Sequence, residues 1–427
     1  AYPATPAGGG DMVEIDLVAG PATTPLVDGV DTEVWAYNGS VPGPAIRAVL
    51  GDTLRISVTN DLPAATTIHW HGIRVPNDMD GVPDVNQARI EPGGTFVYEF
   101  TPPDAGTYWY HSHTDGSEQL ERGLYGSLVI EDPDDGTDYA HDEVWVIDDW
   151  LLTNSGQIDP EFDTADDRTH NGRWGDLITA NASTTEQLTA RPGDRVRLRL
   201  VNASNGRVYR PDFGDLDATL IAIDGLTVKR TTEADDIILA PGNRADIDIT
   251  LPADAGAYAV TDTFTGAPQP LATIVVADEP VTGPDFGAPT NPEVPDWEAA
   301  LDAPIDHELV LETHTTGDEW IWTINGAAYP DHEPLELKAG EFTKIRLVNQ
   351  SHPMHPMHLH GQFFKVLTRN GEPVDEPHFR DTVLLETLDE VEIGLVPLDA
   401  GTWLLHCHTQ EHAEAGMITV MDVAPMR

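Results

Sequence analysis

One phrase occurs three times along the chain, and this repeat constrains the fold more than any other feature. It reads DAGTYWY at residues 104–110, DAGAYAV at 254–260 and DAGTWLL at 399–405. A second phrase precedes each copy: a glycine turn at Gly51, Gly193 or Gly340, followed by alternating apolar and polar residues. Alternation with a period of two is typical of a half-buried β-strand. The repeat therefore predicts an all-β chain of three similar units, each a Greek-key β-sandwich.

The stretches between the repeats set the predicted domain boundaries. An acidic segment at 131–136 and a proline-rich segment that begins at Pro280 interrupt the strand pattern, as is typical of connections and extended linkers. We predict domains at 1–135, 136–280 and 305–427, with a linker at 281–304. Apolar runs stay below the length of about 18–20 residues that spans a bilayer, so no membrane insertion is expected.

The charge balance excludes two classes of partner. The chain has 73 Asp and Glu against 23 Lys and Arg, a formal net charge of −50, which repels nucleic acids and anionic lipid surfaces. Only four of the basic residues are Lys. So many carboxylates with so few lysines predict a halophilic protein, because molar salt screens the self-repulsion.

The chain ends and its cysteine content bear on where the protein works. Residue 1 is Ala instead of Met, which suggests a trimmed mature chain and predicts a secreted or cell-surface protein. Cys407 is the single cysteine, so an intrachain disulfide is impossible. We expect a monomer.

Histidine clusters mark the first and third units. Of 17 histidines, ten fall in four clusters: His69 and His71; His111 and His113; His355, His358 and His360; and His406, His408 and His412. The middle unit has Thr261-Asp262-Thr263 where the outer units have a His-x-His pair. Residues i and i+2 of a strand share a face, so each pair offers two imidazoles to one cavity. Eight buried imidazoles repel one another if protonated, and metal ions resolve that conflict.

Cys407 indicates a second metal site and identifies the metal. It lies between His406 and His408, so its side chain points to the opposite face of their strand. A Cys with two His and a weak axial Met is the ligand set of blue-copper sites, and His355, His412 and Met417 complete it. The repeated His-Pro-Met also makes His352 a possible ligand, although the spacing to His358 and His360 favours His355.

The four motifs, H-W-H-G, H-S-H, H-P-M-H-L-H-G and H-C-H-x3-H-x4-M, resemble those of the multicopper oxidases. The resemblance is to the three-domain, laccase-like branch of bacteria and archaea, and it covers almost the whole chain. It implies three cupredoxin-like domains and four copper ions per chain. It further implies that His355 presents its ring edge to solvent, where substrate gives up electrons. The implied ligands are His355, Cys407, His412 and Met417 for type 1 copper; His69 and His358 for type 2; and His71, His111 and His408, with His113, His360 and His406, for the type 3 pair.

Reduction of O2 to water consumes protons, so carboxylates are expected near the cluster. Asp80, in Met79-Asp80-Gly81, matches an acidic position of relatives, although Asp-Gly is also a common turn. Several relatives have Glu directly after the second type 1 histidine, where this chain has Ala413. Glu411 is the candidate on that side, with Glu414 as an alternative and Glu118 further away in sequence.

The sequence therefore predicts a laccase-like oxidase. Its partners would be small-molecule electron donors, such as phenols and aromatic amines, together with O2. The alternative is a metal oxidase that acts on Cu(I), Fe(II) or Mn(II). The seven methionines are mostly scattered, which gives no evident entry patch for a soft metal. A copper-free scaffold and a copper nitrite reductase fit less well, because the ligand set is complete and includes eight cluster histidines. The middle unit, without ligands, is interpreted as a spacer between the outer units.

Overall fold

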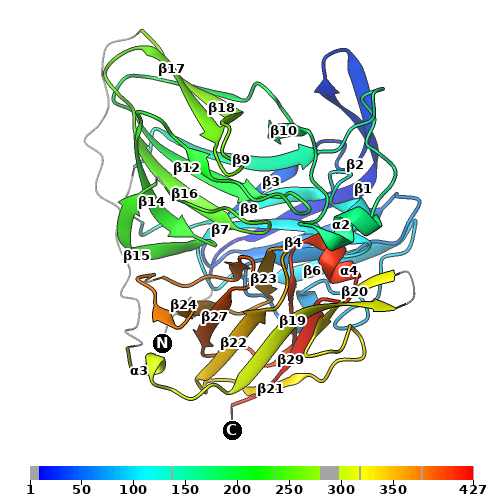
Figure 1. The fold of residues 1–427 in the computed structure, drawn as a ribbon. Coiled ribbons are helices and arrows are strands. Elements are labelled where there is room, and N and C mark those ends of the chain that lie inside the picture. Colours follow the sequence, from blue (N-terminus) through cyan, green and yellow to red (C-terminus); the bar gives the residue numbers. More distant parts are fainter. Residues whose placement is uncertain are drawn as a thin grey trace.

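The computed structural model describes residues 9–135, 138–234, 236–278, 298–316, 319–376 and 378–426. Its six sheets form three pairs that follow one another along the chain (Figure 1). The predicted fold class, all-β with three sandwiches, is confirmed. Of the predicted linker, residues 281–297 lie outside the described part, and Glu298–Leu301 form the helix α3.

The first pair of sheets has the strand orders β2-β1-β4-β6 and β3-β8-β7-β5. Its elements are β1 (Met12–Val27), β2 (Val30–Tyr37), β3 (Gly43–Val49), β4 (Thr53–Asn60), β5 (Ile68–His71), η1 (Asn77–Met79), β6 (Thr95–Phe100), β7 (Gly106–Ser112), α1 (Gly116–Gln119) and β8 (Tyr125–Glu131). The alternating strand β4 buries Leu54, Ile56 and Val58 between the sheets, as the period-two pattern predicts.

The second pair has the orders β10-β9-β12-β16-β14-β15 and β11-β18-β17-β13. Its elements are β9 (His141–Trp150), α2 (Ala165–Thr169), β10 (Leu177–Ala180), β11 (Gln187–Ala190), β12 (Arg195–Asn202), β13 (Pro211–Asp212), β14 (Asp217–Ile223), β15 (Leu226–Glu233), β16 (Arg244–Thr250), β17 (Gly256–Asp262) and β18 (Gln269–Val276). In Figure 1 this unit is mostly green and lies above the third unit, which runs from yellow to red.

The third pair has the orders β20-β19-β22-β27-β24-β25 and β21-β29-β28-β23-β26. Its elements are β19 (His307–Thr316), β20 (Glu319–Ile324), β21 (Leu335–Lys338), β22 (Thr343–Asn349), β23 (His355–Leu359), β24 (Phe364–Arg369), β25 (Glu372–Pro373), β26 (Thr382–Leu385), β27 (Glu390–Leu395), β28 (Gly401–Cys407), α4 (Gln410–Glu414) and β29 (Ile418–Ala424). Within the described ranges the helices are short, and none has the length and apolar content to cross a membrane.

The two repeated phrases occupy equivalent strands in all three units. The phrase that follows the glycine turn forms β4, β12 and β22, and each of these pairs in parallel with the first strand of its unit. The DAG phrase leads into β7, β17 and β28, and each pairs antiparallel with the last strand of its unit. The ends of β7 and β28 therefore have equivalent positions in the two outer units.

Buried polar contacts join the units. Arg74 of the first unit contacts Asp399 of the third at 3.3 Å. Arg199 of the middle unit donates to the Thr107 hydroxyl of the first at 2.7 Å. The first contact joins the two outer units, and the second joins the middle unit to the first.

Candidate metal centres

Two equivalent strand pairs carry most of the predicted ligands. In the first unit β5 pairs antiparallel with β7, which places His69 opposite His111. In the third unit β23 pairs antiparallel with β28, which places His358 opposite His406. Cross-strand neighbours in an antiparallel pair lie close together on one face, so each outer unit presents a group of imidazoles.

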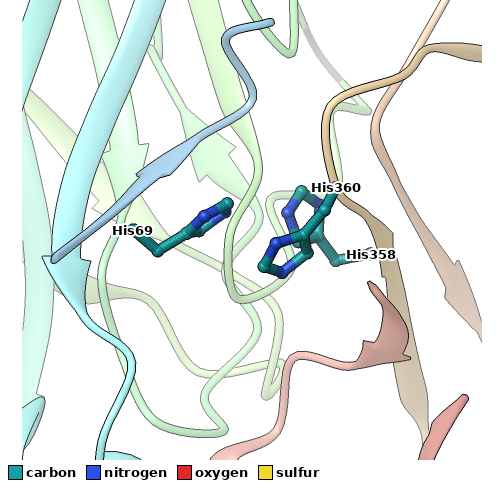
Figure 2. A group of neighbouring side chains, drawn as sticks. All are labelled: His69, His358 and His360. Atoms are coloured by element: carbon teal, nitrogen blue, oxygen red, sulfur yellow. The ribbon is translucent and has the colours of Figure 1, made fainter. Parts of the chain in front are cut away.

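The two groups meet at the interface of the outer units. The histidine cluster consists of His69, His71, His111, His113, His358, His360, His406 and His408. The rings of His69 and His360 stack with centroids 3.8 Å apart, and those of His71 and His358 stack at 3.7 Å. Figure 2 shows His69 facing His358 and His360 from the opposite unit. The structure thus brings all eight predicted cluster ligands together.

Hydrogen bonds orient the rings from behind. One ring nitrogen of His69, His111 and His406 donates to the carbonyl of Asp80, Ser112 and Cys407 respectively, each at 2.8 Å. The opposite nitrogens of His69 and His111 are buried without a hydrogen-bond partner among the described residues. A fixed second nitrogen and a free first nitrogen are the arrangement of metal-binding histidines.

The cluster favours the neutral form of His71, His111 and His408. Burial lowers the pKa of His71, His111 and His408 well below the ordinary value, and neighbouring histidines lower it further. The Nε2 atoms of His360 and His406 lie 3.0 Å apart and form a compact ligand group with His113. Neutral imidazoles with converging lone pairs fit transition-metal ions such as copper. The assignment of each histidine to one particular ion stays a prediction.

The Cys407 site (His355, Cys407, His412 and Met417) lies in the core of the third unit. The Cys407 Sγ is 3.7 Å from the Nδ1 of both His355 and His412, and these two nitrogens are 3.1 Å apart. These separations leave room for one ion at metal–ligand distances of about 2.0–2.3 Å. Met417 is fully buried, and its carbonyl accepts the Cys407 N–H at 3.1 Å.

The structure brings His355, and not His352, to Cys407. His352 is exposed, and its carbonyl accepts a hydrogen bond from Thr387. The expectation that His355 presents its ring edge to solvent is wrong, because His355 is fully buried. Its Nε2 contacts the Ser351 hydroxyl at 2.8 Å, and the indole of Trp322 covers the ring at a centroid distance of 4.8 Å.

A segment of the middle unit covers the other histidine of this site. His412 Nε2 donates to the carbonyl of His170 at 2.8 Å, directly after α2. Asn171 Oδ1 accepts the backbone N–H of Met354 at 2.9 Å. The Trp322 indole donates to the carbonyl of Arg168 at 2.8 Å. We call residues 163–172 the covering segment.

The two predicted carboxylates lie in different surroundings. Asp80 is buried behind the cluster, 3.0 Å from His360 Nδ1 and 3.3 Å from His69 Nδ1. Burial by itself would raise the pKa of Asp80, but interaction with His360 and His69 lowers it well below the ordinary value. The group is therefore an ionised acceptor beside two cluster ligands.

Glu411 is also fully buried, but its contacts are not cluster ligands. It accepts from the Ser117 hydroxyl at 2.9 Å, from Asn205 at 3.0 Å and from the Arg173 N–H at 3.2 Å. Burial raises its pKa despite these bonds. Of the alternatives, Glu414 accepts the Ser117 N–H at 2.8 Å, and Glu118 pairs with Arg122 at 2.7 Å.

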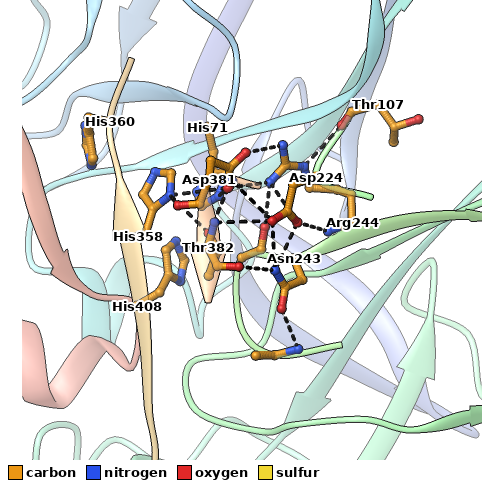
Figure 3. Close-up of polar contacts among 12 residues, drawn as sticks. His71, Thr107, Asp224, Asn243, Arg244, His358, His360, Asp381, Thr382 and His408 are labelled. Atoms are coloured by element: carbon orange, nitrogen blue, oxygen red, sulfur yellow. Dashed lines mark hydrogen bonds and ion pairs between the residues drawn. The ribbon is translucent and has the colours of Figure 1, made fainter. Parts of the chain in front are cut away.

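Sequence reasoning missed a buried ion network beside the cluster. Asp381, Asp224 and Arg244 are all fully buried, and Asp381 contacts both His71 and His358 (Figure 3). Arg244 and Asp224 belong to the middle unit, which has no histidine motif and was therefore not expected to contribute to a site. The one available signal was Gly72, directly after the His-Trp-His motif, because a glycine beside a ligand often marks a close approach of another group.

Fold and sites together define a copper-binding oxidase of three β-sandwich units. Models of the multicopper oxidase family match residues 20–135, 141–278 and 302–427. The chain therefore belongs to the multicopper oxidase family, whose members are oxidoreductases that use copper and O2.

Similar proteins are bacterial and fungal. "Multicopper oxidase MmcO" of Mycobacterium tuberculosis is 31% identical over 97% of this chain and 87% of its own length. "Laccase-5" of Trametes villosa is 30% identical over 92% of this chain and 86% of its own. The solved structure of a multi-copper oxidase from Pseudomonas thermotolerans is 33% identical, with a TM-score of 0.86, and covers 97% of this chain and 99% of that one. A Campylobacter jejuni enzyme described as a metallo-oxidase is 26% identical, with a TM-score of 0.81, over 97% of this chain and 92% of its own.

Proposed function

We propose that this chain is a laccase-type oxidase that takes single electrons from phenols or aromatic amines at the Cys407 site and reduces O2 at the histidine cluster. Four copper ions bound at these sites would supply one-electron transfer and the four-electron reduction of O2 to two waters. The observation that carries the proposal is the connection between the sites. Cys407 belongs to one site, while His406 and His408 on either side of it belong to the other.

The chain itself links the two sites in two ways. The peptide from Cys407 to each neighbouring histidine is a covalent path of a few bonds. In addition, His406 Nδ1 donates to the Cys407 carbonyl at 2.8 Å. The buried core around Cys407 excludes water from that path. At the histidine cluster, the Asp80 carboxylate is a hydrogen-bond acceptor beside His69 and His360.

The proposal is tested by O2 consumption with a phenolic donor. The purified copper-loaded protein should consume one O2 for every four electrons from the phenol. Cys407→Ser should abolish this activity and the intense blue colour of the Cys–copper bond. A colourless copper-loaded protein, or a Cys407→Ser variant of full activity, would contradict the proposal.

A second candidate is a metal oxidase acting on Cu(I), Fe(II) or Mn(II). The covering segment favours it, because it closes off the fully buried His412 through the His170 carbonyl and carries Asp163, Asp166 and Asp167. An acidic cover attracts small cations and keeps bulky phenols from the histidine edge. The ratio of kcat/KM for Fe(II) or Cu(I) to that for a phenol discriminates between the two candidates.

We further propose that the protein is exported, monomeric and adapted to high salt. The formal charge of −50 and the scarcity of lysine support salt adaptation. The similar proteins named above are bacterial and fungal. Fractionation of the producing cells, light scattering and thermal melts in graded salt test the three parts.

A further inference from the structure

An arginine of the middle unit holds a carboxylate that touches two cluster histidines. Arg244, at the start of β16, is fully buried and faces Asp381 of the third unit (Figure 3). Its Nη1 donates to Oδ1 at 3.0 Å, and its Nη2 donates to Oδ2 at 2.7 Å. Two parallel charge-assisted bonds fix both the position and the rotation of the carboxylate.

Asp381 in turn contacts one histidine from each outer unit. Its Oδ1 lies 3.3 Å from His71 Nε2 and 3.4 Å from His358 Nδ1. Its backbone carbonyl is 3.0 Å from the same His358 Nδ1. A carbonyl oxygen can only accept, so the neutral His358 ring carries its N–H on Nδ1, on the Asp381 side.

The two rings keep nitrogens that no hydrogen bond occupies. Both ring nitrogens of His71 and the Nε2 of His358 are buried and have no hydrogen-bond partner within the described ranges. The two rings stack with an interplanar angle of 12°. Each ring therefore has a lone pair available to a metal ion. The orientation of both rings depends on their contacts with Asp381.

The middle unit supports this arrangement from behind. Asp224 Oδ1 accepts from Asn243 at 2.9 Å and from the Arg244 N–H at 3.1 Å. Its Oδ2 accepts the backbone N–H groups of Asp381 and Thr382 at 3.3 and 3.2 Å. Asp224 thus fixes the backbone on both sides of the ion pair.

Two glycines let the network come this close to the ligands. Gly72, with φ of +85°, follows His71, and a Cβ there would overlap Arg244 Nη2. Gly242, with φ of +88°, faces the cluster from the middle unit, where a Cβ would lie 2.8 Å from His71 Cε1. Larger residues at either position would displace the guanidinium or the imidazole.

The geometry points to Arg244 as a positioning residue of the histidine cluster: through the Asp381 carboxylate it fixes the orientation of the His71 and His358 rings. The middle unit then helps to position cluster ligands, in addition to separating the outer units. This inference rests on the proposed function, because it assumes that the cluster binds copper.

The test uses the copper-loaded full chain and two substitutions of Arg244. Arg244→Gln removes the paired bonds and should weaken copper binding at the cluster by about 10- to 100-fold. Arg244→Lys keeps the charge but not the two parallel bonds, so it should retain copper and change the paramagnetic resonance spectrum of type 2 copper. The visible band of Cys407-bound copper should stay unchanged in both variants.

Arg199→Gln is the matched control. Arg199 is only 2% exposed and contacts Thr107 and Asp246, while Arg244 contacts Thr107 and Asp381. Its substitution should lower the melting temperature without altering the type 2 spectrum. If the Arg244→Lys protein folds with the wild-type spectrum, or if all variants differ only in melting temperature, the inference is wrong. A wild-type chain that binds no copper would instead contradict the proposed function.

Discussion

The imidazole of His412 donates a hydrogen bond from Nε2 to the backbone carbonyl of His170, at 2.8 Å. The bond joins a ligand of the Cys407 site to the middle unit and closes the edge by which a donor would otherwise touch that ligand. It also fixes the tautomer that leaves His412 Nδ1 free for metal. Electrons from a bulky donor must therefore cross the covering segment, unless the donor displaces that segment.

Loosening the covering segment should favour bulky donors. Asn171→Ala removes the bond to the Met354 N–H, so we expect kcat/KM for bulky phenols to rise several-fold while Fe(II) oxidation changes little. Thr169→Ala is the control, because the Thr169 hydroxyl bonds to Ala165, Asp166 and the His170 ring, all within the covering segment, and to no residue of the third unit. Steady-state kinetics with a series of phenols of increasing size measures the effect, and equal changes in both variants would contradict it.

Asp80→Asn should slow O2 reduction without affecting the Cys407 site. The variant removes an ionised acceptor beside His69 and His360, and the loss of a positioned proton-transfer group costs about 100-fold or more in rate. Stopped-flow measurement should show normal anaerobic bleaching of the blue band and slow recovery when O2 is added.

Glu411→Gln provides the comparison for Asp80. Glu411 contacts Ser117, Asn205 and Arg173, so its substitution should cost about 1–3 kcal/mol of stability through imperfectly paired donors. We expect a smaller effect on reoxidation than in Asp80→Asn. The reverse order of effects would make Glu411 the proton donor to the cluster.

Loading of the Cys407 site should release one proton. Burial raises the pKa of the metal-free Cys407 thiol to about 12, whereas the metal binds the thiolate. Burial lowers the pKa of His412 to about 4, so this ligand is already neutral at pH 6–8. Affinity at this site should therefore rise about tenfold per pH unit over that range. Titration calorimetry in buffers of different ionisation enthalpy counts the protons, and Cys407→Ser should release none there.

Thermal stability should increase with salt. A formal charge of −50 opposes the compact state, and molar NaCl shortens the screening length to about 3 Å. Melts of the copper-free protein from low to molar NaCl should show a steady rise in Tm, and NaCl and KCl should act alike. A Tm that is highest at low salt would contradict the proposed salt adaptation but not the copper chemistry.

The sequence was enough to predict the strands and the convergence of the ligands. The alternation of apolar and polar residues after Gly51, Gly193 and Gly340 predicts β4, β12 and β22. A strand with one buried face has an apolar residue at every second position. The His-x-His pairs recur at the ends of equivalent strands, so their meeting follows from the repeat. The opposite direction of Cys407 follows from the same strand periodicity.

The rest could not be predicted, because it depends on contacts between distant segments. The His170 contact to His412 uses a backbone carbonyl, which has no residue signature. The expected exposure of His355 was wrong because Ser351 and Trp322 cover that ring. Arg244 lies 137 residues from Asp381, and neither belongs to a recognisable motif. The interpretation of the middle unit as a spacer rested on its lack of histidines and could not include the contribution of Arg244.

The most direct test of the account is the copper content and visible spectrum of the chain and of Cys407→Ser, measured on the same preparations. We predict about four copper ions and an intense blue band for the wild-type chain. Cys407→Ser should lose the band and one copper ion and keep the copper of the histidine cluster. A wild-type chain without the band, or with copper only at the Cys407 site, would contradict the account.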